Sequence, residues 1–240
     1  PVAVRYAAAP LAVQLIGDVG GDGRGAAGLG AAFDAALSGT GEGDTLTCLV
    51  NAQGRLRSEP EQTHTDSGAV GVQLTLSRSV QRAAEAVAGR MMTTGCIVVL
   101  DAANAEVRAC VSVPGYDPAD PAASLTAADS PMLNRAFQSY AVGSVFKPVL
   151  AAAALEAGET GLVYTCPGWC EVDGQVFRCA GGIPHGEVDL AAALEKSCNG
   201  YFIRLGQVLG AERVRALAEQ VGFGQAAELT DRFRTAAGIL

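Results

Sequence analysis

Ser144 and Lys147 are the residues whose types and spacing best suit covalent chemistry in this sequence. They stand at the head of an alanine-rich segment for which we expect a helix, and residues three apart on a helix lie on one face. The Lys147 amine can then take the Ser144 proton, provided that burial and the helix dipole lower the pKa of Lys147 from about 10.4 toward neutrality. The pair therefore predicts a serine nucleophile with a lysine base. Taken alone, the pattern is more often an N-cap serine followed by a solvated lysine.

A second polar group, Ser197-Cys198-Asn199, follows about fifty residues later along the chain. Taken alone, it fits an ordinary helix C-terminus with Asn199-Gly200 as the cap, because glycine and asparagine are favoured at that position. The spacing by itself assigns no chemistry to this group.

Composition and charge limit the classes of protein to which the chain can belong. The chain has 240 residues, 49% of them hydrophobic, which is ample for a buried core. The formal charge of −8 is spread over scattered acids and bases, and it provides no basic stripe for a nucleic acid. Apolar runs such as residues 149–155 are far shorter than the roughly 20 residues of a membrane span, so we expect none here.

The elements that must position these residues follow from apolar periodicity. Residues 1–70 are glycine-rich and irregular, and we place a boundary near Gly68 to Gly71. A helix over 80–90 is expected to begin after a Ser77 cap and to bury Val80, Ala83, Ala84 and Val87. The expected strands are 72–76, 95–101 and 107–113, the last two forming a hairpin with a turn around 103–105, and further helices are expected at 144–157, 188–196, 201–209 and 211–220. Strands and helices without strict alternation predict an α+β fold, an antiparallel sheet flanked by helices.

Seven cysteines are present, and three of them cluster as Cys166, Cys170 and Cys179, with His185 six residues further. A Cys3His zinc site is the most specific interpretation, although the short Cys-x2-Cys knuckle is missing. A disulfide between Cys166 and Cys179 is favoured if the domain is extracytoplasmic, and it would stabilise the fold by roughly 3 kcal/mol. Free thiols are the third interpretation, and we assign no metal or cofactor.

Several stretches, in order, resemble the penicillin-binding protein transpeptidases, the family known for a Ser-x-x-Lys motif. The resemblance covers roughly residues 70–240, which we expect to hold the N-terminal part of the transpeptidase domain. It rests on Leu133 to Ala136 with Tyr140 to Pro148, on the hairpin Gly95 to Pro114 with Tyr116-Asp117-Pro118, on His185 to Leu190 through Ser197-Cys198-Asn199-Gly200-Tyr201-Phe202, and on Val221 to Gly224.

Residues 1–70 look like the end of the pedestal, or dimerisation, region of class B members of this family. The similarity lies in Gln14 to Gly17 and in Gly28 to Gly39. Gly30, Ala105 and Val142 stand where the family usually has an acidic residue, a glycine and a proline, and none of these departures touches the chemistry.

The resemblance implies a role for each motif residue. Ser144 would attack the penultimate D-Ala carbonyl of a peptidoglycan stem peptide, and Lys147 would take its proton. Ser197 would relay a proton to the leaving group, while Asn199 would bind the substrate amide and orient Lys147. An amine from a neighbouring stem or water would resolve the acyl-enzyme, and a β-lactam would acylate Ser144 and stay.

The family's third motif, Lys-[Ser/Thr]-Gly, does not occur in the sequence, whose only lysines are Lys147 and Lys196. In the family this strand donates one N–H of the oxyanion hole, and losing such a donor typically costs about 10² to 10³ in rate. We therefore expect a fragment of a larger enzyme with an incomplete fold, impaired activity and a tendency to self-associate through an uncovered sheet edge.

Two alternatives to the peptidoglycan DD-transpeptidase remain open. One is a non-catalytic scaffold or β-lactam sensor with the same fold, and the other is a serine β-lactamase, against which the pedestal-like segment argues. The resemblance implies stem peptides, β-lactams and cell-wall synthesis proteins as partners. It also implies a place on the extracytoplasmic face of the bacterial cell membrane, held by an N-terminal anchor outside this sequence.

Overall fold

The computed structural model describes residues 9–39, 43–65, 68–230 and 233–239, and the chain divides into two compact units. The first unit comprises the described parts of Pro1–Gln138 and Glu228–Thr235, and the second those of Ser139–Ala227 and Ala236–Leu240. The boundary expected near residue 70 lies inside the first unit, so a division at that point stays a prediction. Among the described residues, no helix has the length and apolar character that a bilayer span requires.

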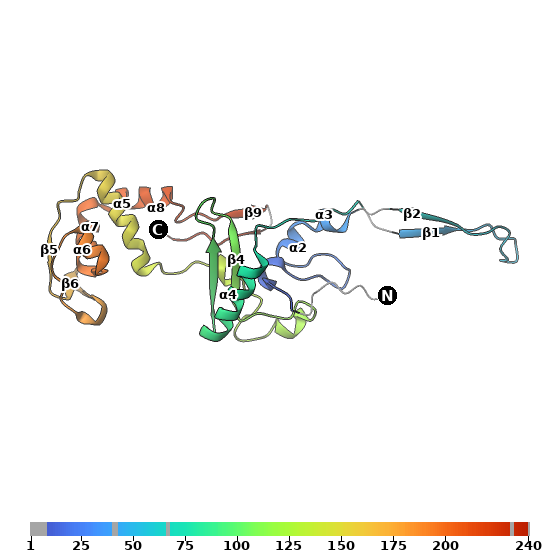
Figure 1. Ribbon diagram of the computed structural model, residues 1–240, viewed down its shortest axis with the longest axis horizontal. Coiled ribbons are helices and arrows are strands. Elements are labelled where there is room, and N and C mark those ends of the chain that lie inside the picture. The colour runs from blue at the N-terminus through green and yellow to red at the C-terminus, as the bar shows by residue number, and fades with distance from the viewer. Residues whose placement is uncertain (1–8, 40–42, 66–67, 231–232, 240) are drawn as a thin grey trace. The chain divides into compact units, whose positions relative to one another are not determined.

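The first unit is built from antiparallel strand pairs and short helices (Figure 1). Strand β1 pairs with β2, β3 with β4, and β9 with β10. In chain order the elements are α1 (Val13–Ile16), α2 (Gly28–Ala32), α3 (Asp34–Ser38), β1 (Gly43–Thr47), β2 (Glu61–Thr65), α4 (Arg78–Met91), β3 (Gly95–Leu100), β4 (Val107–Val113), the 3₁₀ turns η1 (Pro121–Ser124) and η2 (Arg135–Phe137), β9 (Glu228–Thr230) and β10 (Phe233–Arg234).

Helix α4 packs on strand β4, and its inward face agrees in part with the expected one, because Val80 and Ala84 pack into the cluster that α4 shares with β4. The buried residues of α4 are Gln81, Ala84 and Ala88, whereas Ala83 and Val87 are exposed. Gln81 is only 1% exposed because its amide bonds both backbone groups of Cys110: the Cys110 N–H donates to Oε1 at 2.8 Å, and Nε2 donates to the Cys110 carbonyl at 3.0 Å. Hydrophobicity alone could not predict this face, since a polar side chain completes the hydrogen bonds of the strand.

The prediction of a strand over residues 72–76 is wrong, because this segment does not pair with another strand through a ladder of backbone hydrogen bonds. It runs beside β4 and is held there by single hydrogen bonds, from Thr75 Oγ1 to the Val107 carbonyl at 2.8 Å and from the Ser77 N–H to the Arg108 carbonyl at 2.9 Å. Ser77 occupies the N-cap position of α4, but its side chain bonds the Ser79 hydroxyl instead of a helix N–H.

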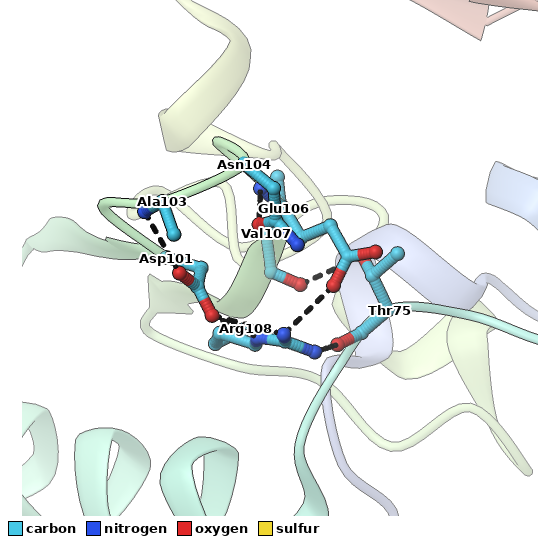
Figure 2. Close-up of polar contacts among 7 residues, drawn as sticks. All are labelled: Thr75, Asp101, Ala103, Asn104, Glu106, Val107 and Arg108. Atoms are coloured by element: carbon cyan, nitrogen blue, oxygen red, sulfur yellow. Dashed lines mark hydrogen bonds and ion pairs between the residues drawn. The ribbon is translucent and has the colours of Figure 1, made fainter.

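The hairpin of β3 and β4 is confirmed, and its turn is held by charged side chains (Figure 2). The Arg108 guanidinium reaches Asp101 at 3.0 Å and Glu106 at 2.8 Å, and it also bonds the Thr75 carbonyl at 3.3 Å. A hydrogen bond from the Ala103 N–H, followed by the bond from Arg108, lowers the pKa of Asp101 below its ordinary value. At the end of the turn Ala105 has φ 59°, in the left-handed region that favours glycine.

The N-terminal segment packs against this hairpin. Ala12 and Leu15 share a buried cluster with Cys110 of β4. The side-chain amide of Gln14 donates to the carbonyls of Pro114 and Pro131, at 2.9 and 2.8 Å. These contacts explain why residues from both sides of position 70 belong to one compact unit.

The second unit combines helices with two small antiparallel pairs, β5 with β8 and β6 with β7 (Figure 1). Its core lies among α5, α6, α7 and α8 and is centred on Tyr201 and Leu205, both with no exposed surface. The elements are η3 (Gly143–Phe146), α5 (Lys147–Ala157), β5 (Tyr164–Cys166), β6 (Trp169–Val172), β7 (Gln175–Arg178), the 3₁₀ turn η4 (Ala180–Gly182), β8 (Gly186–Val188), α6 (Leu190–Glu195), α7 (Asn199–Leu209) and α8 (Ala211–Gln220).

The helices expected in the second unit are confirmed, with shifts at their boundaries: residues 144–146 belong to the 3₁₀ turn η3, α6 spans Leu190–Glu195, and α7 begins at Asn199. Val188 ends strand β8, and Asp189 then caps α6 by accepting from the Ala192 N–H at 2.8 Å. An acidic N-cap explains why the helix begins after this residue. With helices packed on antiparallel strand pairs in both units, the α+β prediction is confirmed.

Candidate active site

Ser144 and Lys147 lie at the junction of a 3₁₀ turn and a helix. Ser144 belongs to η3, and Lys147 is the first residue of α5, followed by Pro148 in the first helical turn, where proline is tolerated. In a 3₁₀ turn, side chains three residues apart eclipse one another. The turn therefore sets the Lys147 amine Nζ 3.2 Å from Ser144 Oγ, while Ser144 itself is exposed.

Lys147 is buried, with 7% of its surface exposed, and its amine gathers the other predicted site residues. Nζ lies 2.7 Å from the Ser197 carbonyl oxygen, 2.8 Å from Ser197 Oγ and 2.6 Å from Asn199 Oδ1. The structure thus brings together all four residues that the sequence singled out. Their chemical roles stay predictions.

Ser197 and Asn199 are held in place by the connection between α6 and α7. Ser197 has φ 50°, which turns the chain sharply, and Cys198 is the N-cap residue of α7 with no exposed surface. Asn199 is the first residue of α7, so an Asn199-Gly200 cap at a helix C-terminus is wrong. The amide of Asn199 accepts from Lys147 and donates through Nδ2 to the Arg178 carbonyl at 2.7 Å, and these two bonds define its orientation.

Burial makes Lys147 easier to deprotonate. Burial lowers the pKa of Lys147 below its ordinary value, against a smaller opposite effect of Cys179 and Cys198. The Ser197 carbonyl and Asn199 Oδ1 can only accept hydrogen bonds, and a neutral amine has two N–H groups to donate to them. Its lone pair is then available for the proton of the Ser144 hydroxyl, which is the geometry that a general base needs.

An open hollow of about 400 Å³ adjoins the lysine. Its walls come from η3, α5, β7 and α7, and they are mainly apolar. The lining residues are Gly143, Phe146, Lys147, Leu150, Phe177, Arg178, Asn199, Phe202, Ile203 and Gly206. An exposed serine, a buried lysine and an adjacent apolar hollow together suit acyl transfer through a serine ester.

Next to this site, the cysteine–histidine group has a different membership from the one expected. Cys166, Cys179 and His185 come together with Cys198, and Cys170 does not belong to the group. The seven cysteines are free, and the Cys166 and Cys179 sulfurs lie 3.6 Å apart without a bond. The sequence did not indicate that Cys198 belongs to this group, because Cys198 lies far along the chain from Cys166 and Cys179. Its position between Ser197 and Asn199 was the one local feature that could have suggested it.

Several known proteins are similar to this chain in sequence. The family described as "Penicillin binding protein transpeptidase domain" matches residues 95–238. Stage V sporulation protein D of Bacillus subtilis is 30% identical over 88% of this chain and 34% of its own length. The peptidoglycan D,D-transpeptidase MrdA of Escherichia coli is 29% identical over 73% of this chain and 29% of its own length.

Solved structures with similar folds include members that carry β-lactams. The D,D-transpeptidase domain of a peptidoglycan glycosyltransferase from Eggerthella lenta superposes with a TM-score of 0.75 at 29% identity, over 98% of this chain and 51% of that chain. The imipenem acyl-enzyme complex of penicillin-binding protein A from M. tuberculosis gives a TM-score of 0.61 at 28% identity, over 68% of this chain and 42% of that chain. The chain spans about a third of the length of the curated relatives that it matches.

Proposed function

Because this chain belongs to the penicillin-binding protein transpeptidase family, we propose that it supplies the nucleophile and base of a peptidoglycan D,D-transpeptidase. The observation that carries the proposal is the Lys147 amine, which lies within 3.2 Å of Ser144, Ser197 and Asn199 at once. The relatives named D,D-transpeptidases support the same reaction.

In the proposed reaction, neutral Lys147 takes the proton of Ser144 as Oγ attacks the carbonyl carbon of the penultimate D-Ala of a stem peptide. The bond to the terminal D-Ala then breaks, and Ser197, 2.8 Å from the lysine, passes a proton to the leaving amine. The acyl group stays on Ser144 as an ester. An amine of a neighbouring stem attacks this ester and forms the cross-link, or water hydrolyses it.

Asn199 would serve the reaction in two ways. Its Oδ1 holds the Lys147 amine, and its side chain lies on the hollow, where it can bond the substrate amide. The bond from Nδ2 to the Arg178 carbonyl keeps the amide oriented when no substrate is bound. β-Lactams, which acylate the nucleophile in the relatives described as acyl-enzyme complexes, would react with the same serine here.

Further parts of the proposal concern the setting of the protein. We place its action on the extracytoplasmic side of the bacterial membrane, with an N-terminal anchor, together with other cell-wall synthesis proteins. Residues 1–70 would be the end of the pedestal region, and the rest the N-terminal part of the transpeptidase domain. The second candidate is a non-catalytic scaffold or β-lactam sensor with the same fold.

The test is intact-protein mass spectrometry after incubation with penicillin G, followed by mapping of the modified peptide. We expect an adduct on Ser144 that is lost in Ser144→Ala and reduced at least about 100-fold in rate in Lys147→Met, since the base is then missing. Ser139→Ala, an exposed serine five positions away, is the matched control and should keep the adduct. The proposal would be refuted if the adduct mapped to a residue other than Ser144, or if the full-length protein formed no adduct.

Release of D-Ala separates the two candidates. A transpeptidase releases D-Ala from a stem pentapeptide in the presence of an acceptor amine, whereas a sensor is acylated by penicillin G and releases none. Acylation without any D-Ala release by the full-length protein would therefore favour the sensor.

A further inference from the structure

One face of the hairpin formed by β6 and β7 carries the only tryptophan of the sequence. In the register of the two strands, Trp169 lies opposite Arg178, and Glu171 lies opposite Val176. Side chains directly opposite each other, and side chains two apart on one strand, point to the same side of a sheet, so these four share one face. All four are exposed, Trp169 to 47%, whereas the alternate residues of β6 are half-buried. This Trp169 face therefore points to solvent.

The polar groups of the Trp169 face have no protein partner in the described part of the chain. This holds for the Trp169 indole N–H, the Glu171 carboxylate and the Arg178 guanidinium. Glu171 and Arg178 stand diagonally across the two strands and form no ion pair with each other. Because a tryptophan side chain gains much from burial, its exposure beside two charged groups that bond nothing in the protein favours a binding surface.

Both ends of the hairpin are fixed by its backbone. The strands are joined by a two-residue turn in which Asp173 has φ 49° and Gly174 has φ 77°, both in the left-handed region that a tight hairpin turn uses. At the other end, the Gly168 carbonyl accepts from the Cys179 N–H at 2.9 Å, and a Cβ added to Gly168 would lie 2.3 Å from the Gly182 oxygen. The side chains are thus presented on a preorganised backbone, which lowers the entropy cost of binding.

The side chains of the Trp169 face suit an N-acetylated sugar. One side of a pyranose ring presents C–H groups that can stack on the indole, while the edge of the ring carries hydroxyl and acetamido groups. The Arg178 guanidinium can donate to the acetamido carbonyl, and the Glu171 carboxylate can accept from the acetamido N–H or from a hydroxyl. A purely apolar partner would leave both charges buried and unpaired, and the phosphates of a nucleic acid would be repelled by Glu171.

We propose that the Trp169 face binds the glycan strand of peptidoglycan, with an N-acetylated sugar stacked on Trp169 and its acetamido group between Glu171 and Arg178. The proposal rests on the function proposed above, because the stem peptides that Ser144 would attack are carried by such sugars. The face gives the protein a second contact with the same polymer, and this contact aligns a stem peptide with the nucleophile.

The Trp169 face adjoins the candidate active site. Asn199 accepts from the Lys147 amine at 2.6 Å and donates to the Arg178 carbonyl at 2.7 Å, and Trp169 is one interstrand step of about 4.7–4.9 Å further. In a stem pentapeptide the penultimate residue is the fourth from the sugar, and an extended chain spans at most about 3.3–3.6 Å per residue, so the sugar lies within roughly 15 Å of the attacked carbonyl. The steps from Lys147 to Trp169 are comparable in length, so one substrate can reach both.

Fluorescence of the single tryptophan tests the proposal in this chain without any need for activity. The probe is a peptide-free tetrasaccharide of alternating N-acetylglucosamine and N-acetylmuramic acid, and maltotetraose, which lacks acetamido groups, is the control sugar. We expect a saturable change in Trp169 emission with the probe and none with maltotetraose. In calorimetry, Trp169→Ala should weaken binding of the probe at least about tenfold, and Trp169→Phe should restore part of it. Arg178→Ala should also weaken binding, whereas Arg213→Ala, which changes an exposed arginine of α8, should not.

Circular dichroism identifies variants that fail to fold, and Arg178→Ala, which keeps the tryptophan, is the variant to measure if Trp169→Ala does not fold. The proposal is overturned if the probe leaves the emission unchanged, if maltotetraose changes it equally, or if Trp169→Ala binds the probe as tightly as the native chain does. A response to a free stem pentapeptide but not to the probe would also overturn it, because the face would then bind peptide and not glycan.

Kinetics of the full-length protein separate this proposal from the proposed function. In the release of D-Ala, Trp169→Ala should raise KM at least about tenfold for stem peptides carried on glycan, with kcat unchanged, and it should leave release from a free pentapeptide as it is. Binding of the probe without a Ser144 adduct from penicillin G would refute the proposed function and leave the sugar site. A Ser144 adduct without binding of the probe would refute the sugar site alone.

Discussion

The protonation state of Lys147 is the property on which the proposed chemistry depends most, and Asn199→Asp perturbs it directly. The substitution replaces the amide oxygen, 2.6 Å from Nζ, by a carboxylate oxygen of nearly the same shape. At that distance Coulomb's law gives about 6 kcal/mol in favour of the ammonium at an effective dielectric constant of 20. Desolvation of the new carboxylate opposes part of this, and neighbouring opposite charges usually shift a pKa by about 1–3 units, or about 1.4–4 kcal/mol.

The sign of the change follows from the charge. Burial lowers the pKa of Lys147 in the native protein, and a carboxylate at position 199 should raise it again by about 1–3 units. Wherever that pKa lies above the working pH, the fraction of neutral lysine falls tenfold for each unit. Acylation of Ser144 should therefore fall about 10- to 1,000-fold near neutral pH, with the acid limb of its pH profile moved upward by the same number of units.

Nuclear magnetic resonance can measure this pKa without any need for activity. The sequence contains only two lysines, so a chain labelled with ¹³C at lysine Cε gives two signals to titrate. The signal of the exposed Lys196 serves as an internal reference, and Lys147→Met assigns the other. Asn199→Ala is the uncharged control, because it removes the same amide oxygen without adding a carboxylate, and it should not raise the pKa of Lys147.

Two results would refute this reasoning. In the first, the Lys147 pKa is the same in Asn199→Asp as in the native chain, which would mean that the contact at position 199 does not form in solution. In the second, Asn199→Ala raises the pKa as much as Asn199→Asp does, which would mean that the amide and not the charge sets it.

Three further predictions concern packing and backbone conformation. Gln81→Met should lower the free energy of unfolding by about 2–4 kcal/mol in urea denaturation, because it leaves the N–H and carbonyl of Cys110 buried without partners; a loss under 1 kcal/mol would contradict this account. Ala105→Gly should raise the free energy of unfolding by about 0.5–1 kcal/mol, since the native φ of 59° suits glycine, and a lower unfolding midpoint would speak against it. Gly200→Ala should destabilise the chain by about 1–3 kcal/mol in the same assay, because the added Cβ would lie 2.8 Å from the Tyr164 ring; an unchanged midpoint would show that the ring moves aside without cost.

The structure clarifies which predictions local sequence could support. The helix of residues 147–157, the hairpin of residues 95–113 and the pairing of Ser144 with Lys147 depend on neighbours within one turn or one strand pair. Their apolar periods and turn residues are read directly from the chain. These elements were predicted correctly for that reason.

The features that were predicted wrongly depend on contacts with residues far away in the sequence. The inward face of α4 is decided by the bonds of Gln81 to Cys110, which lies 29 residues away. The segment 72–76 has the alternation of a strand, but the single bonds that tie it to β4 do not form a ladder. Neither the buried face of α4 nor the lack of strand pairing at residues 72–76 can be predicted from the local pattern of apolar residues.

The sequence by itself determined a serine–lysine pair at the start of a helix, because three residues of spacing suffice for that geometry. Only the tertiary structure decided that Asn199, 52 residues further, reaches the same lysine at 2.6 Å. It also decided that Cys198 and not Cys170 completes the cysteine–histidine group. The physical reason is that side chains from separate elements meet only when the core has packed, and spacing along the chain carries no record of that packing.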